Sequence, residues 1–330
     1  MDKILILGSN SCSGSGVISE LAKSNQYKIL PTSRSQERDH YYLPYKWQKY
    51  SSLMNFQCID INTSLNELNE LIDEFKPKFI INFASQSMVS QSWDSPEDWM
   101  YTNVFSMIKL IKLINNKKFV KKYIHFSTPE VYGDTGNSWI TENYNFKPTT
   151  PYALSRSASD NLVQMWHENF GFPSIITRSA NVFGPGQQLY RIIPKAIYMI
   201  LKGEKIPLHG GGKSVRSFIH YSDIAQALDL IIKNGQKGET YHISESESIS
   251  IYDLIKMITE LLSVDFKSSI EITKDRRGKD SYYLLDSAKL SKLGWKSQIS
   301  LEKGIFECIK WIKKNFKKIS SDDLKYIHRK

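Results

Sequence analysis

The chain has 330 residues, of which 41% are hydrophobic and 24% charged, which is typical of a globular protein large enough for two lobes. Its formal net charge is +10, yet it has no apolar run long enough to span a membrane and no secretory leader before the first predicted strand. Three widely separated cysteines lack metal-ligand spacing, so we expect no metal, reduced thiols and a cytoplasmic location.

Short apolar runs alternate with amphipathic stretches through the first 180 residues. The predicted strands are Lys3–Leu7, Tyr27–Pro31, Phe56–Ile61, Phe79–Ala84, Tyr123–Ser127 and Ser174–Arg178. The predicted helices are Ser15–Ser24, Leu65–Phe75, Glu97–Asn115 and Pro151–Phe170. Buried strands that alternate with helices indicate an α/β fold with a doubly wound parallel sheet of the Rossmann type.

Beyond about residue 180 the pattern loosens. The predicted helices there are Ile192–Lys202, Ile224–Lys233, Ile251–Leu262 and Leu301–Phe316. We therefore expect a larger lobe over residues 1–180 and a smaller mixed α/β lobe over 181–330, partly interleaved with the first. The stretch Arg34–Asn55 is predicted to be an ordered excursion at one end of the sheet. Its aromatic residues are expected to pack rather than to bind a ligand: Tyr41, Tyr42, Tyr45, Trp47 and Tyr50.

Two interpretations of the basic charge compete. Much of the lysine excess falls in Lys313–Lys318 and in the tail Lys325–Lys330. A phosphate-rich partner would explain it, but a solvated terminal helix is the commoner reason for such a run. Because no nucleic-acid motif accompanies it, we expect neither a nucleic acid nor a membrane as a partner.

A glycine loop follows the first predicted strand. Small residues at this point let backbone amides approach a pyrophosphate at the start of a helix. A serine, Ser11, stands where a glycine is usual. The loop predicts a dinucleotide site that includes Gly8, Asn10, Ser11, Cys12, Ser13 and Gly14.

In dinucleotide-binding folds, residues at the end of the second strand contact the cofactor's ribose. An acidic residue there selects NAD, whereas hydroxyl groups and arginine accept the 2′-phosphate of NADP. The chain has Ser33 and Arg34 at this point, which favours NADP. NAD remains the alternative if the loop bends to present Glu37 or Asp39.

The residues that indicate chemistry come in two groups. Ser127-Thr128-Pro129-Glu130 follows the fifth predicted strand, and Tyr152 and Arg156 lie at i and i+4 in a predicted helix. On one helix face, the arginine's charge should lower the tyrosine's pKa and make it a base for a sugar hydroxyl. The predicted catalytic residues are Thr128, Glu130, Tyr152 and Arg156.

Together these motifs resemble the extended short-chain dehydrogenases/reductases that act on nucleotide sugars, above all the dTDP-glucose and GDP-mannose 4,6-dehydratases. The resemblance covers nearly the whole chain and includes Phe83–Val89, Asn181–Gly186, Arg216–His220 and Leu293–Trp295. It implies an NAD(P)-binding domain over residues 1–180 and a nucleotide-sugar-binding lobe over 181–330.

The resemblance also implies roles for individual residues. Those expected at the cofactor, besides the loop, are Asp60, Ile61, Phe83, Ala84, Ser85, Gln86, Asn103, Tyr152 and Arg156. Thr128 would bind the sugar's 4-hydroxyl. Those expected to hold the nucleotide-diphosphate sugar are Ser87, Asn181, Arg191, Arg216 and Arg276. The family's helices equivalent to Glu97–Asn115 and Pro151–Phe170 form a four-helix bundle across a two-fold axis, which implies a homodimer.

In a 4,6-dehydratase, Tyr152 would take the 4-hydroxyl proton and Glu130 the C5 proton, giving a 4-keto-6-deoxyhexose. Two departures stand out: Arg156 replaces the family's lysine, and Pro129 replaces the aspartic acid that protonates the leaving hydroxyl in dTDP-glucose dehydratases. The proton donor is then Glu130 or a water. A 4-epimerase or 4-keto reductase would need Thr128 and Tyr152 but not Glu130, and a non-catalytic nucleotide-binding protein would need none of them.

Overall fold

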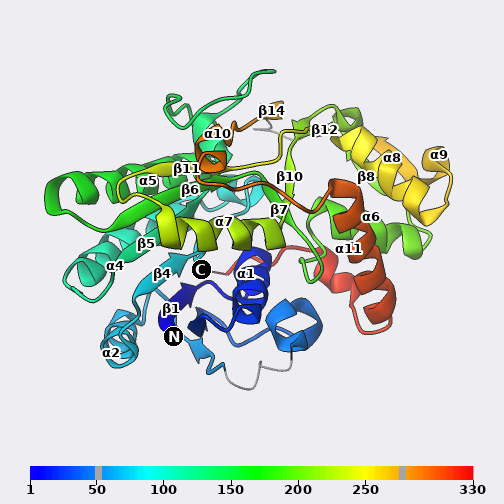
Figure 1. Cartoon of the computed structure of the whole chain (residues 1–330). Coiled ribbons are helices and arrows are strands. Elements are labelled where there is room, and N and C mark those ends of the chain that lie inside the picture. The colour runs from blue at the N-terminus through cyan, green and yellow to red at the C-terminus, as the bar shows by residue number, and fades with distance from the viewer. Residues whose placement is uncertain (49–53, 275–279, 330) are drawn as a thin grey trace.

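Within the described residues, seven parallel strands form the central sheet of the larger lobe (Figure 1). The computed structural model describes residues 1–48, 54–274 and 280–329. The strands, in spatial order, are β3 (Gln57–Cys58), β2 (Tyr27–Ser33), β1 (Asp2–Leu7), β4 (Phe79–Asn82), β5 (Lys122–Ser127), β6 (Ser174–Ser179) and β11 (Thr240–Ile243). The chain winds outward from β1 in both directions, so a crevice opens at the carboxyl ends of β1 and β4.

Helices cover both faces of this sheet. The helices of the larger lobe are α1 (Cys12–Lys23), α2 (Leu65–Phe75), α3 (Pro96–Met100), α4 (Ser106–Asn115), α5 (Pro151–Phe170), α7 (Tyr221–Asn234) and α10 (Ala288–Ser291). Because side chains alternate along a strand, Ile4 and Ile6 of β1 pack with α1 and α7, whereas Leu5 and Leu7 pack with α2, α4 and α5. Burial on both faces explains the unbroken apolar run of β1.

The described part of the smaller lobe consists of four helices, two pairs of short strands and one three-stranded sheet. Its helices are α6 (Ile192–Leu201), α8 (Ile251–Leu262), α9 (Phe266–Ser269) and α11 (Leu301–Asn315). Its strands are β7 (Asn181–Phe183), β8 (Ile206–His209), β9 (Val215–Arg216), β10 (Phe218–His220), β12 (Ile249–Ser250), β13 (Ile270–Thr273) and β14 (Tyr282–Tyr283). Ile197, Leu254 and Ile309 lie in a separate core shared by α6, α8 and α11.

The Rossmann-type α/β fold predicted from the sequence is confirmed, with three local differences. The first helix begins at Cys12 rather than Ser15, because Ser11 caps it. The third strand is only two residues long, because the chain turns at Asp60, whose carboxylate accepts the amide of Asn62 at 2.8 Å. The predicted helix Glu97–Asn115 consists of α3 and α4 joined by a π-helical turn over Tyr101–Phe105.

Besides α10, two further elements that follow residue 180 in the sequence belong to the larger lobe. Strand β11 pairs with β6, and α7 packs against α1. The lobes are therefore interleaved, and the domain boundary at residue 180 stays a prediction.

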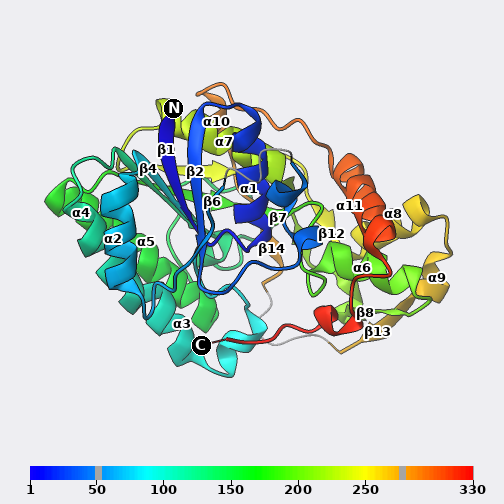
Figure 2. The same ribbon diagram turned by 90° about the horizontal axis from the view of Figure 1, so that it is seen from below.

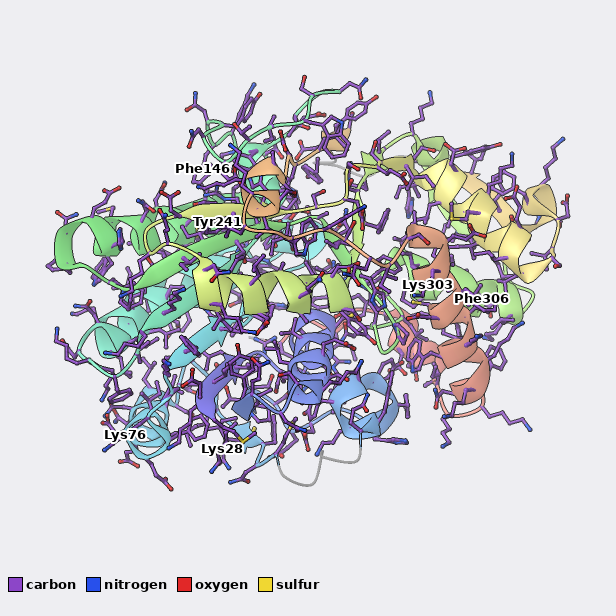
Figure 3. The ribbon with its side chains drawn as sticks, viewed as in Figure 1. Lys28, Lys76, Phe146, Tyr241, Lys303 and Phe306 are labelled. Carbon is purple, nitrogen blue, oxygen red and sulfur yellow. The ribbon has the colours of Figure 1, made fainter. Side chains whose placement is uncertain are left out.

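The lysine-rich surface is spread over the molecule. Figure 3 shows Lys28 and Lys76 on the larger lobe and Lys303 on α11 of the smaller lobe. In the described part of the chain, no helix is both long and apolar enough to cross a membrane. Among the same residues, no group of three or more histidine, cysteine or acidic side chains is placed to hold a metal ion.

Candidate active site

The glycine loop brings β1 close to the backbone that follows β4. Gly8 has φ +87°, and a Cβ there would come within 2.8 Å of the Ala84 nitrogen. Ser11 has φ −76°, its hydroxyl donates to the Gly8 carbonyl at 2.8 Å, and it accepts the Gly14 amide at 3.0 Å. Serine therefore serves here as an N-cap, and nothing in its backbone conformation requires glycine.

A cavity of about 120 Å³ lies beside this loop at the crevice between β1 and β4. It is lined by Leu7, Gly8, Ser11, Thr32, Ser33, Arg34, Ile59, Asp60, Ile61, Phe83, Ala84, Ser85 and Thr102. Nine of the seventeen residues predicted to bind a dinucleotide are thus brought together from four segments. Sequence reasoning missed Leu7, Thr32, Ile59 and Thr102 as lining residues; the first three stand at the ends of predicted strands, where such residues are to be expected.

Other loop residues support the cavity from outside. The Asn10 amide donates to the Ser35 carbonyl at 3.0 Å and to the Gln36 carbonyl at 2.9 Å, which ties the loop to the segment after β2. Cys12 is buried, and burial raises the pKa of its thiol to about 12, while Ser13 stays partly exposed. Asn103, in the π-helical turn, binds the Gln86 backbone and donates to Ser155 at 2.9 Å.

The carboxylates considered as alternative ribose ligands are engaged elsewhere. Glu37 forms an ion pair with Lys46 at 2.7 Å and accepts the Tyr45 hydroxyl. Asp39 accepts the Tyr41 hydroxyl at 2.7 Å. Ser33 and Arg34 line the cavity instead. Tyr41, Tyr42 and Tyr45 are buried, which confirms the packing role predicted for them, whereas Tyr50 lies outside the described residues.

The predicted catalytic groups meet where β5 ends and α5 begins. The Thr128 hydroxyl donates to Glu130 Oε2 at 2.7 Å, and Thr128 caps the helical turn Pro129–Tyr132. Tyr152 lies in the first turn of α5, with its amide bound to Ser92 Oγ at 3.1 Å. Tyr152 as a whole is 6% exposed, and its phenol is within hydrogen-bonding reach of Thr128.

Burial raises the pKa values of Glu130 and Tyr152 more than the surrounding positive charges lower them. Burial raises the pKa of Glu130, although the Thr128 hydrogen bond and the charges of Arg216 and Arg191 oppose the shift. Burial, together with the negative charge of Glu130, raises the pKa of Tyr152 to about 12, and the opposing charge of Arg156 does not reverse this. The sequence-based prediction of a lowered tyrosine pKa is wrong for this structure, because burial outweighs the guanidinium.

The Arg156 side chain reaches past Tyr152 to the sheet. Its Nη2 donates to the Phe126 carbonyl at 2.6 Å and lies 3.3 Å from His125 Nε2. Arg156 Nε and Ser127 Oγ are buried and have no hydrogen-bond partner among the described residues. Buried donors without partners are costly, so a hydroxyl-bearing ligand such as a ribose fits here. These atoms and the Gly8 cradle match a bound nicotinamide dinucleotide.

A buried network of His125, Asp160 and Arg178 packs beside the Arg156 guanidinium. His125 lies 3.4 Å from Asp160, and Asp160 accepts Arg178 Nε at 2.8 Å. Burial alone would raise the pKa of Asp160, but the charge of Arg178 outweighs it and holds that pKa well below its usual range. Burial lowers the pKa of His125, which is therefore neutral near pH 7.

The residues predicted to hold the nucleotide-diphosphate sugar have mixed placements. Arg191 Nη2 lies 3.3 Å from Ser87 Oγ and is within electrostatic range of both Glu130 and Tyr152. Arg216 donates to the Asp280 carbonyl at 2.7 Å and stacks 4.2 Å from the Tyr283 ring. Asn181 is exposed, and its side-chain amide donates a hydrogen bond to the Ser217 carbonyl at 3.2 Å. Arg276 lies outside the described residues.

Two residues near Glu130 were missed. The Asp280 carboxylate accepts the hydroxyl of Thr149 and, at 2.6 Å, that of Tyr283, and both residues act electrostatically on the Glu130 region. They lie within Arg276–Asp286, a segment that the family resemblance covers, but no local pattern marks either of them as part of a site.

Comparisons with known proteins agree on one family. A family model described as GDP-mannose 4,6-dehydratase matches residues 5–308. A dTDP-glucose 4,6-dehydratase of Haemophilus influenzae is 31% identical over 277 residues, which cover 78% of this chain and 82% of that protein. A trifunctional UDP-glucose 4,6-dehydratase of Arabidopsis thaliana is 30% identical over 270 residues, but they span only 40% of its length.

The solved structures agree in fold. A dTDP-glucose 4,6-dehydratase of Streptomyces venezuelae, crystallised with NAD, has a TM-score of 0.89 and 26% identity, with 98% of this chain and 100% of that chain covered. A UDP-glucose 4-epimerase of Thermotoga maritima has a TM-score of 0.85 at 22% identity, with 95% of this chain and 99% of that chain covered, which shows a shared fold.

Removing the charge of Asp160 should destabilise the protein strongly. Asp160→Asn would leave Arg178 buried without a counter-charge, so we expect a loss of about 3–5 kcal/mol of unfolding free energy, measured by urea denaturation at pH 7. Because the pKa of Asp160 is lowered by folding, the wild type's advantage should shrink as the pH falls through that lowered pKa.

The matched control is Glu20→Gln, which breaks the exposed pair with Lys23 and should change the unfolding free energy by no more than about 0.5 kcal/mol. Equal losses in the two variants would contradict the importance of the buried network.

Proposed function

This chain belongs to the GDP-mannose 4,6-dehydratase family, and we propose that it converts a nucleotide-diphosphate hexose into the corresponding 4-keto-6-deoxyhexose. The observation that supports the proposal best is Glu130. Its carboxylate is held by Thr128 at 2.7 Å, in the same cleft as the Tyr152 phenol. An epimerase or a keto reductase has no proton to remove at C5 and no need for such a base.

The reaction divides the work between cofactor and side chains. When bound in its oxidised form, a nicotinamide dinucleotide brings a positively charged ring that accepts the C4 hydride and later returns it to C6. Tyr152 takes the proton of the 4-hydroxyl, which Thr128 orients. The positive charge of the ring acts in the same direction as Arg156, against the burial that keeps the phenol protonated in the structure.

Glu130 removes the proton at C5 once C4 carries a carbonyl, because the carbonyl acidifies its neighbouring carbon. The C6 hydroxyl then leaves as water, and it needs a proton to do so. With Pro129 in the neighbouring position, we propose that Glu130 itself delivers the proton it has just accepted. A carboxylate whose pKa is raised by burial is a stronger base toward the C5 proton than an exposed glutamate, and once protonated it is the neutral acid that the departing hydroxyl needs.

Replacing the base should stop the elimination and leave binding intact. In Glu130→Gln we expect the rate of water loss to fall by about 10²–10⁴-fold, the range for removal of a general base, while dinucleotide affinity changes little. In the assay, purified protein is incubated with dTDP-, GDP-, CDP- and UDP-hexoses, and the masses of the products are measured by mass spectrometry. A dehydration product is one water lighter, whereas an epimer keeps its mass and a reductase consumes added reduced cofactor.

The control for this variant is Glu67→Gln, on the exposed face of α2. In the wild type, lowering the pH protonates Glu130, so the rate should fall on the acid side at a pH above that of an ordinary glutamate. Normal water loss by Glu130→Gln would sink the assignment of the base.

For the cofactor we propose NADP, with Ser33 and Arg34 as ligands of its 2′-phosphate. Both residues line the cavity, and Glu37 and Asp39 are engaged with other side chains. A guanidinium forms charge-assisted hydrogen bonds with the 2′-phosphate of NADP, a group that NAD lacks. The solved relative that carries NAD keeps NAD as the alternative.

Arg34→Ala should separate the two cofactors. We expect the dissociation constant for NADP to rise about tenfold or more, since hydrogen bonds to charged groups contribute about 1.5–3 kcal/mol, and that for NAD to change little. Titration calorimetry measures both. Lys28→Ala removes a positive charge from an exposed residue outside the cavity lining and serves as the control. Tighter binding of NAD than of NADP by the wild type would refute the preference.

We also propose a homodimer. Tyr101 and Phe105 in the π-helical turn, and Leu154, Met165 and Phe170 on α5, leave 44–63% of their surfaces exposed. Figures 1 and 2 show α4 and α5 side by side at one edge of the larger lobe, and α3 and α4 pack against α5. Large apolar side chains exposed along paired helices suit a bundle with a second copy.

A charge in this face should split the dimer. Phe105→Glu should give a monomeric mass by light scattering at micromolar concentration, because burying a carboxylate in an apolar interface is costly. Phe306→Glu, on the exposed face of α11 (Figure 3), changes an equally exposed phenylalanine elsewhere and should leave the mass unchanged. A monomeric wild type would contradict the proposal.

A further inference from the structure

The segment after α11 crosses from one lobe to the other. Figure 2 shows it leave α11 and end beside α3, close to the carboxyl ends of the central strands. We call residues Ser320–Arg329 the C-terminal strap. No family motif in the sequence covers it, and its contacts are with residues far away in the chain.

The strap is attached to the smaller lobe at its beginning. Its helical turn, Ser321–Leu324, starts with Ser321, whose hydroxyl accepts Lys202 Nζ at 3.0 Å. The Asp323 carboxylate accepts the Tyr42 hydroxyl at 2.8 Å. Both partners belong to the packed segments around α6 and α11, so this end is held in place.

The other end is attached to the larger lobe. His328 Nε2 lies 2.7 Å from the Asp98 carboxylate, and its ring stacks on Trp99 with centroids 4.8 Å apart and planes 14° from parallel. Asp98 and Trp99 are in α3. An ion pair and a stacked ring on one helix fix both the position and the orientation of the strap's end.

Between these attachments the strap binds Gln86. The Gln86 side-chain amide donates to the Arg329 carbonyl at 2.6 Å, and its oxygen lies 3.4 Å from the Tyr326 hydroxyl. Gln86 directly follows Ala84 and Ser85, which line the dinucleotide cavity. Its backbone is held by Asn103, whereas both of these side-chain hydrogen bonds go to the strap.

Tyr326 lies near several arginines at the proposed site. Its ring packs edge-on against Tyr190 with centroids 5.3 Å apart. Its phenol is within electrostatic range of Arg34, Arg38 and Arg191, three cations from two different segments. Arg34 lines the dinucleotide cavity, and Arg191 lies beside Ser87. The strap therefore passes across the place where the phosphates of a dinucleotide would meet these cations.

We propose that the C-terminal strap closes over the bound dinucleotide and that Tyr326 is a positioning residue that, through Gln86, keeps the cofactor from leaving between turnovers. The inference rests on the proposed function, because a reaction that returns its hydride leaves the cofactor as it began. Such an enzyme does not release the cofactor in each catalytic cycle, so a strap that slows its release does not lower the turnover rate.

The test measures how fast bound dinucleotide leaves the full-length protein. Protein loaded with reduced cofactor, followed by its fluorescence, is mixed with excess oxidised cofactor for Tyr326→Ala, His328→Ala and the wild type. We expect dissociation about tenfold faster in both variants, since changes within one interface act mostly on the dissociation rate. Ile327→Ala alters a strap residue that is 70% exposed and should match the wild type.

A second measurement does not depend on substitutions. Trypsin can cut the strap after the exposed Lys325, and bound dinucleotide should slow that cut, as followed by mass spectrometry of the intact chain. Wild-type dissociation rates in both variants, or cleavage unaffected by dinucleotide, would overturn the proposal. Neither readout involves a sugar, so a protein that retains its cofactor through the strap but dehydrates no hexose would refute the function alone.

Discussion

The hydrogen bond from Thr128 to Glu130 is the contact on which the proposed chemistry depends. It joins a hydroxyl at the end of β5 to a carboxylate two residues later, 2.7 Å away. The carboxylate is thereby fixed beside the first turn of α5, where Tyr152 lies. Without this contact the carboxylate would have no fixed distance from the phenol, and proton removal at two neighbouring carbons of one ring requires such a distance.

Burial sets the proton affinities in this cleft more than any single charge does. It raises the pKa of both Glu130 and Tyr152, and the nearby cations only moderate the effect. Arg156 illustrates the balance: its guanidinium is bound to the Phe126 carbonyl and backed by the His125–Asp160–Arg178 network, so it is rigid but not in direct contact with the phenol. The free protein therefore holds both protons more tightly than isolated side chains would, and the charge of a bound cofactor is needed to shift Tyr152.

Local sequence signals predicted much of this structure. The apolar strands and the capped helix Pro151–Phe170 depend on nearby residues, and they were found with small errors at their ends. Most of the residues predicted at the dinucleotide also lie together, because parallel strands end at one edge of the sheet. The tyrosine's pKa was predicted wrongly because it depends on burial by segments far away in the sequence. The interpretation of the tail as a solvated terminal helix is wrong for the same reason: residues 325–329 are not helical, and Gln86 and Arg329, which they bring together, are 243 residues apart.

The measurement that tests the account most directly is the mass of the product formed in heavy water. On this account Glu130 passes the C5 proton to the leaving hydroxyl, so the proton that later completes C5 comes from solvent, whereas the hydride returned to C6 comes from C4. The account therefore predicts a nucleotide sugar that has lost one water and gained one deuterium, located at C5. A product of unchanged mass, or one that has lost water without taking up deuterium at C5, would contradict it.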